Sequence, residues 1–195
     1  MIEKIIEDIV NSLVINNIIS REQKEEYQYA LICEIESLII IGSVLIIASI
    51  CQRLFSTVCF LWFFLKLRKR VGGYHLNSFM GCYLGSICMY GLVVCLCSMS
   101  NSHMFYLNLL GVIACLYITI VGTVNHPNIH MNFVELKNTK ILARRTLILE
   151  LIIIKILKYM EVDVDIINYS LMGIIMCALL LFIAKMLGQE VKENG

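Results

Sequence analysis

A histidine and a cysteine, His75 and Cys82, lie seven residues apart between two very apolar segments of the chain. The run that holds them is Arg68-Lys69-Arg70-Val71-Gly72-Gly73-Tyr74-His75-Leu76-Asn77-Ser78-Phe79-Met80-Gly81-Cys82, which opens with three consecutive cations. An imidazole paired with a thiol is a general base paired with a nucleophile, the arrangement used in cysteine-based acyl transfer. These residue types therefore predict cysteine acyl chemistry at a membrane boundary.

The backbone must break for this pair to meet. On an uninterrupted helix the two side chains would share a face, but a rise of about 10.5 Å would keep them apart. Gly72-Gly73 favours non-helical backbone, and Asn77 or Ser78 is a good N-cap for a following helix. We expect His75 to lie on a loop that folds back over the first turns of that helix. The helix N-terminus and the nearby cations would favour the Cys82 thiolate.

Spacing and chemistry alone leave a second interpretation open, in which His75 is a surface residue and Cys82 a lipid-facing thiol. The other eight of the nine cysteines lie in or beside apolar runs, where cysteine behaves as a small hydrophobic residue. His126 and His130 have a metal-ligand spacing, but Pro127 disfavours helical backbone there. We predict no metal site and no cofactor.

The composition is that of an integral membrane protein. Hydrophobic residues make up 59% of the 195 residues and charged residues 16%, against about 45–50% and about 25% in soluble domains. A single proline and long Ile/Leu runs favour helices over a barrel. We predict an all-α, polytopic integral membrane protein that contacts the lipid bilayer and binds no nucleic acid.

The apolar runs predict about six transmembrane helices after an amphipathic interfacial helix at 1–19. Ser20 and Gln23 resemble a capping box that opens the second helix. The predicted spans are Ser37–Cys51, Leu54–Leu65, Phe79–Ser98, Met104–Val124, Thr146–Met160 and Ile166–Ala184, with a polar turn at 98–103. The short third segment, Lys155 and Lys158 leave four or five spans as alternatives.

The positions of the cations predict the orientation. The Lys/Arg clusters at 66–70 and 137–145 are two spans apart, so both lie on the cytoplasmic side. Both termini are then cytoplasmic, and the turns at 98–103 and 161–165 face outward. We predict one membrane domain over 1–195, with a cytoplasmic catalytic segment at 66–82 and a cytoplasmic basic loop at 125–145.

The run Arg68–Cys82 resembles the signature of the accessory gene regulator B (AgrB) family, bacterial membrane cysteine endopeptidases that process quorum-sensing peptide precursors. The amphipathic first helix, the several spans and the loop around Val124-Asn125-His126-Pro127-Asn128 also resemble the family. The resemblance places the catalytic histidine on His75, the nucleophile on Cys82, the glycine before the histidine on Gly73 and the basic residue on Arg70. One departure is His126-Pro127, where the family often has Ala-Pro and a second proline further on.

The resemblance implies an enzyme in the bacterial cell membrane that cleaves the C-terminal tail from an AgrD-like precursor peptide. A thioester on Cys82 would be followed by cyclisation to a thiolactone or lactone autoinducer. The candidate substrate-binding residues are Arg70, Gly73, Asn77, Ser78, Pro127, Asn128, Lys137, Lys140, Arg144 and Arg145.

The cations among these residues, with Arg68 and Lys69, are expected to form a cytoplasmic basic surface that meets acidic residues of the precursor. Charge that only sets the topology is the other interpretation. A non-enzymatic small membrane transporter or regulator is the alternative function, and the few spans leave room for a homodimer.

Overall fold

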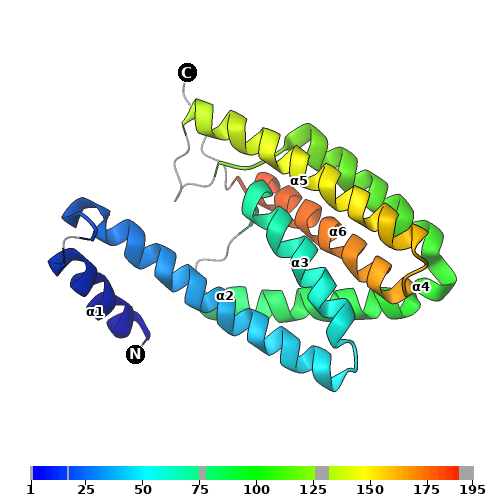
Figure 1. Cartoon of the computed structure of the whole chain (residues 1–195), viewed down its shortest axis with the longest axis horizontal. Coiled ribbons are helices and arrows are strands. Elements are labelled where there is room, and N and C mark those ends of the chain that lie inside the picture. Colours follow the sequence, from blue (N-terminus) through cyan, green and yellow to red (C-terminus); the bar gives the residue numbers. More distant parts are fainter. Residues whose placement is uncertain (1, 17, 75–77, 126–131, 189–195) are drawn as a thin grey trace. The chain divides into compact units, whose positions relative to one another are not determined.

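The computed structural model describes residues 2–16, 18–74, 78–125 and 132–188, and every regular element in these ranges is a helix (Figure 1). The predicted all-α class is confirmed. The chain forms two compact units, Met1–Ile46 and Ile47–Gly195, and their boundary falls inside helix α2 (Lys24–Ile50).

The first unit contains the predicted amphipathic helix as α1 (Ile2–Ile15). Ile6 and Val10 of its apolar stripe are buried in a small core with Ile19, while Glu7 and Asp8 are exposed. The core comprises Ile6, Val10 and Ile19, with Leu13, Val14, Leu31, Ile32 and Ile35 packed against it. A short 3₁₀ helix, η1 (Arg21–Gln23), precedes α2, and the Ser20 N–H donates to Gln23 Oε1 at 3.2 Å. This contact confirms the predicted capping box.

The second unit is a bundle of four helices: α3 (Leu54–Val71), α4 (Phe79–Val121), α5 (Phe133–Tyr159) and α6 (Val164–Met186). Helix α6 packs against the other three, and its residues 167–178 are all buried (Figure 1). A Cβ atom on Gly173 would lie 2.9 Å from Phe63 Cβ and 3.0 Å from the Phe64 backbone nitrogen. The missing side chain therefore lets α3 and α6 approach closely.

One end of the bundle carries the His/Cys motif, and we call it the motif end. There the Val124 N–H donates to Val71 O at 3.2 Å, and the Tyr74 N–H donates to Leu180 O at 3.1 Å. These bonds join the end of α3, the end of α4 and the last part of α6. The predicted cytoplasmic segments at 66–82 and from 125 onward thus begin side by side.

The other end of the bundle, which we call the opposite end, holds connections between helices that we predicted to face outward. Arg53, just before α3, forms an ion pair with Asp165 in the first turn of α6. Lys158 Nζ near the end of α5 donates to Asn108 Oδ1 of α4 at 3.4 Å. These contacts join α3 to α6 and α4 to α5 at the opposite end.

Helix α4 is continuous for 43 residues, which would make it about 64 Å long if it were straight. Its ends cannot be that far apart, because Val124 is bonded to Val71. Only about 28 Å of chain can join Val71 to Phe79, and about 10 Å joins Val121 to Val124. The helix must therefore bend back on itself, and in Figure 1 its ribbon changes direction between two halves.

Three predicted boundaries are wrong. The turn at 98–103 is helical backbone within the bent α4, because the polar residues there include neither proline nor glycine. Helix α3 runs through the cations that we took as its end and stops at Val71. Residues 133–145, predicted as part of a loop, form the first half of α5, because Asn132 and Glu135 make a capping box.

The predicted six spans are not confirmed. Within the described ranges, two helices are long and apolar enough to cross a membrane, Phe79–Met99 and Val164–Met186, and Phe105–Val121 is a shorter apolar helix. Charged residues interrupt the others: α3 ends in Arg68, Lys69 and Arg70, and α5 contains Glu150 and Lys155. An all-helical fold with two such helices is consistent with a membrane location.

Candidate active site

The motif occupies a break between two helices. Helix α3 ends at Val71, and Gly72 follows with φ 70° and ψ −152°, a backbone conformation that favours glycine. Helix α4 begins at Phe79 with Ser78 as N-cap, whose Oγ accepts the Gly81 N–H at 3.2 Å. The predicted break and the predicted cap are confirmed. His75 and Asn77 lie outside the described residues.

Arg68 holds the segment that leads from α3 toward His75. Its Nη1 donates to Gly72 O at 2.6 Å, and its Nη2 donates to Tyr74 O at 2.7 Å. Burial lowers the pKa of the Arg68 guanidinium, and the charges of Cys177 and Cys82 act in the opposite direction. Arg68 therefore binds the loop backbone and also interacts electrostatically with the Cys82 sulfur.

Gly73 leaves the space that Arg68 occupies. Its φ is 141°, and a Cβ atom built on it would lie 1.6 Å from Arg68 Nη1 and 3.2 Å from Leu180 Cβ. No side chain fits there unless the guanidinium moves. Gly72 thus allows the turn after α3, and Gly73 leaves room for the Arg68 guanidinium.

Two further contacts fix the backbone around this loop. Thr123 Oγ1 donates to Val71 O at 3.0 Å, the same oxygen that accepts the Val124 N–H. Thr123, Val124 and Asn125 are all buried at the motif end. Pro127 and Asn128, which follow two and three residues later, lie outside the described residues.

Cys82 lies in the first turn of α4, half-buried, with its backbone N–H donating to Ser78 O at 3.0 Å. The N-terminal turn of a helix carries a partial positive charge that favours a nearby anion. Phe79 and Tyr83 flank this turn with ring centroids 6.0 Å apart. The first turn of α4 and the charge of Arg68 thus both contribute to the surroundings of Cys82.

The predicted basic surface is only partly exposed. Arg70, Lys137, Arg144 and Arg145 are exposed, as is Lys69. Lys140 packs its stem on Gly122, where a Cβ would lie 2.8 Å from Lys140 Cγ, and Arg144 Nε donates to Thr119 O at 2.9 Å. Arg68 was expected on this surface, and that expectation is wrong because its donors bind Gly72 and Tyr74.

Comparison with known protein families matches the chain to accessory gene regulator B over residues 3–184. The chain belongs to the AgrB family. No curated protein and no solved structure is matched. Membership in the AgrB family is consistent with autoinducer precursor processing in quorum sensing and with a membrane location.

Sequence reasoning on this AgrB family member missed the role of Arg68 and the contribution of Thr123 and Leu180. For Arg68 a local signal exists: a cation in the last helical turn, just before a glycine, often binds carbonyl groups released at the helix end. Thr123 lies 52 residues along the chain from its partner Val71, and Leu180 lies 106 residues from its partner Tyr74. No local signal could have shown those contacts.

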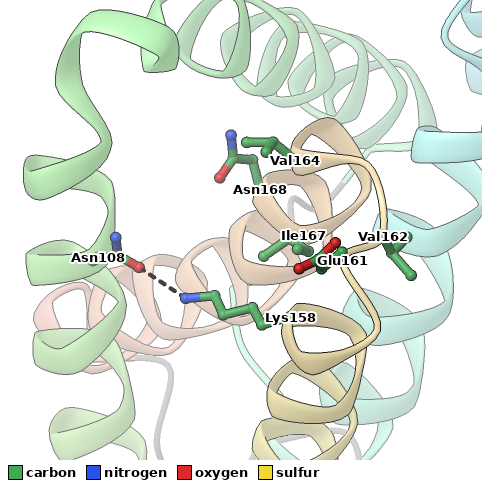
Figure 2. A pocket seen from close by; sticks show the side chains of 7 residues that line it. All are labelled: Asn108, Lys158, Glu161, Val162, Val164, Ile167 and Asn168. Atoms are coloured by element: carbon green, nitrogen blue, oxygen red, sulfur yellow. Dashed lines mark hydrogen bonds between the residues drawn. The ribbon is translucent and has the colours of Figure 1, made fainter.

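A cavity lined by both polar and apolar side chains lies at the opposite end of the bundle (Figure 2). It has a volume of about 390 Å³ and is lined by Asn108, Lys158, Glu161, Val162, Val164, Ile167 and Asn168. Leu180, which contacts the motif, lies 12 residues beyond Asn168 on α6, a rise of about 18 Å. The cavity is therefore separate from the candidate active site.

Proposed function

We propose that this protein is a membrane cysteine endopeptidase that removes the C-terminal tail of an AgrD-like precursor peptide and cyclises the remainder. The observation that carries the proposal is the placement of Cys82. It lies in the first turn of α4, its charge interacts with that of Arg68, and the backbone breaks between it and α3. Family membership supports the same reaction class.

In the proposed first step, His75 takes the proton of the Cys82 thiol, and the thiolate attacks the carbonyl carbon of the scissile peptide bond. The resulting tetrahedral intermediate expels the tail as an amine, which receives the proton from His75. A thioester then joins Cys82 to the N-terminal part of the precursor. The fixed positions of Tyr74 and Ser78 on either side of His75 support this pairing.

In the proposed second step, a cysteine or serine within the bound peptide attacks the thioester carbonyl. The new ring bond is a thioester or an ester, the proton of the attacking thiol or hydroxyl passes to His75, and the Cys82 thiolate is released. Attack within one molecule has a large effective-concentration advantage over attack by water. Water must still be kept from the acyl-enzyme, because hydrolysis would give a linear peptide. Phe79 and Tyr83 provide apolar surface beside Cys82 for that purpose.

The proposed substrate contacts surround the loop. The exposed cations Arg70, Lys137, Arg144 and Arg145, with Lys140, would meet acidic residues of the precursor. Asn77, Ser78, Pro127 and Asn128 would contact the peptide near the scissile bond. For Gly73 the described contacts support a positioning role through Arg68.

We also propose a multi-pass topology of about six spans, with both termini and the motif end cytoplasmic. The grouping of connections supports it, since the basic segments meet at one end and the acidic turn after α5 lies at the other. A newly made precursor would then reach the site from the cytoplasm. A homodimer is compatible with so small a bundle.

The decisive variants are Cys82→Ala and Cys88→Ala, which remove thiols six residues apart on the same helix. We expect Cys82→Ala to abolish conversion of the precursor, followed by its length on a gel, and Cys88→Ala to retain it. Iodoacetamide should also modify Cys82 much faster than the buried Cys97 and Cys177. Cleavage that persists in Cys82→Ala would overturn the proposal and favour a transporter or regulator.

A further inference from the structure

Helix α5 presents one carboxylic acid to the interior of the bundle. Its buried residues are Ala143, Leu147, Glu150 and Ile154, at the spacing of one helical face. Glu150 is 0% exposed, and neither of its carboxyl oxygens has a hydrogen-bond partner among the described residues. Glu150 therefore occupies a core-facing position on α5, where an apolar side chain could be buried without the cost of desolvating a polar group.

Three other helices contribute titratable groups that face Glu150. Lys66 of α3, Cys115 of α4 and Cys177 of α6 interact with it electrostatically. Lys66 is the only cation among them, and its Nζ lies 4.4 Å from the centroid of the Trp62 ring. The Cys177 thiol already donates to Phe64 O at 3.3 Å. Glu150 therefore has no ion-pair partner in the part of the chain that the structure describes.

An ionised carboxylate in such a place is strongly unfavourable, because burial removes its hydration and no partner replaces it. The neutral acid avoids most of that cost, since it must satisfy a single O–H donor. An ionisable side chain inside a membrane helix usually faces the bundle interior and has a function. Glu150 lies in the core of the bundle, and its protonation is independent of the reaction proposed at Cys82.

We propose that Glu150 is a proton-binding site inside the helix bundle, and that it holds its proton in the folded state at neutral pH. Release of the proton leaves a buried charge, and Lys66 is a cation that interacts with it electrostatically. Lys66 must then leave Trp62 to pair with it, which changes the packing of α3 against α5. The site thus makes the stability of the bundle depend on pH.

The direction of that dependence follows from proton counting. In the unfolded chain a glutamate is ionised above a pH of about 4.3, whereas the folded bundle retains the proton. The folded state then binds more protons than the unfolded state, so stability falls as the pH rises. Glu150→Gln removes this dependence because its amide does not titrate.

The proton can be observed directly by infrared spectroscopy of the full chain in lipid nanodiscs. We expect the carbonyl band of a protonated carboxyl group at neutral pH in the wild type and in Glu161→Gln, which removes an exposed carboxylate. The band should be absent in Glu150→Gln. If that variant does not fold, labelling of glutamate with carbon-13 in the wild type should shift the band.

Two results would overturn the proposal. One is a wild-type spectrum without a protonated glutamate band at neutral pH. The other is a Lys66→Met variant that unfolds at a much lower temperature at neutral pH, because this would mean that Glu150 is ionised and paired with Lys66. The proposal expects Lys66→Met to retain the band, and expects thermal stability to fall between about pH 6 and about pH 9 in the wild type but not in Glu150→Gln.

Discussion

Arg68 is the residue through which the chain after α3 is held in place. It binds two backbone carbonyls of the loop and lies where a side chain on Gly73 would be. Its charge also interacts with Cys82. A lysine could supply the charge but not the two forked donors, because an ammonium group is a single point of contact.

We therefore predict that Arg68→Met lowers precursor conversion by about 10–100-fold, because misplacing a catalytic group lowers the reaction rate by factors of that order. It should also move the alkylation of Cys82 by iodoacetamide to higher pH, because the thiolate loses a nearby cation. Arg68→Lys should bring the pH dependence of Cys82 alkylation close to that of the wild type. It should recover less of the precursor conversion.

Lys69→Met is the matched control, since it removes a neighbouring cation whose side chain is exposed. The alkylation profile of Cys82 should stay unchanged in this variant. An unchanged profile in Arg68→Met as well would show that Arg68 has no influence on the thiol.

At the residue scale, local chemistry was sufficient to predict the Ser78 cap and the break at Gly72-Gly73, because both depend on preferences of single residues. The fold-back of Arg68 and the burial of Glu150 could not be predicted in this way. A cation in a charged run and an acid in an apolar run have the same local pattern whether they face inward or outward.

Helix α6 is the element that the other three helices of the bundle share, and its close approach to α3 depends on Gly173. We predict that Gly173→Ala destabilises the protein by about 1–3 kcal/mol, the usual cost of overpacking a tight contact. The new Cβ would meet backbone atoms of α3, which cannot rotate away. Thermal unfolding in detergent measures the change.

Gly91→Ala provides the control for Gly173→Ala. Gly91 is also in a helix of the same unit, but a Cβ there would have nothing within 4 Å. This change should be neutral or stabilising by about 0.5–1 kcal/mol, because alanine favours a helix more than glycine. Equal effects of the two variants would argue against the close contact between α3 and α6.

At the element scale, the apolar runs predicted where helices form but not where they end. Charged residues were taken as boundaries, yet α3 continues through its cations and α5 begins before the basic residues of 137–145. Lysine and arginine are good helix formers, so they limit the apolar length without ending the helix. The cap at Asn132 was the better local signal.

The whole bundle brings the two basic segments to the motif end and places the turn after α5 at the opposite end. We predict that Lys69→Cys and Glu161→Cys, each in a variant without the nine native cysteines, lie on different sides of the membrane. An impermeant maleimide should label Glu161→Cys in intact cells and Lys69→Cys only after permeabilisation. Labelling of both from the same side would contradict the proposed topology.

For the molecule as a whole, the sequence could not predict which distant segments contact one another. The alternation of spans predicts which connections share a side, but not that Val71 bonds to Val124 or Tyr74 to Leu180. Those bonds depend on how α4 bends and how α6 inserts between its neighbours. Such features arise from packing between distant segments.

The central claim is a covalent intermediate on Cys82, and its capture is the most direct test. Membranes that contain the protein are mixed with a precursor whose internal cysteine or serine is replaced by alanine, so that cyclisation cannot release it. After rapid denaturation, mass spectrometry should find the N-terminal part of the precursor attached to Cys82 by a bond that hydroxylamine cleaves. Precursor cleavage with no adduct, or with an adduct on another residue such as Cys88, would contradict the mechanism.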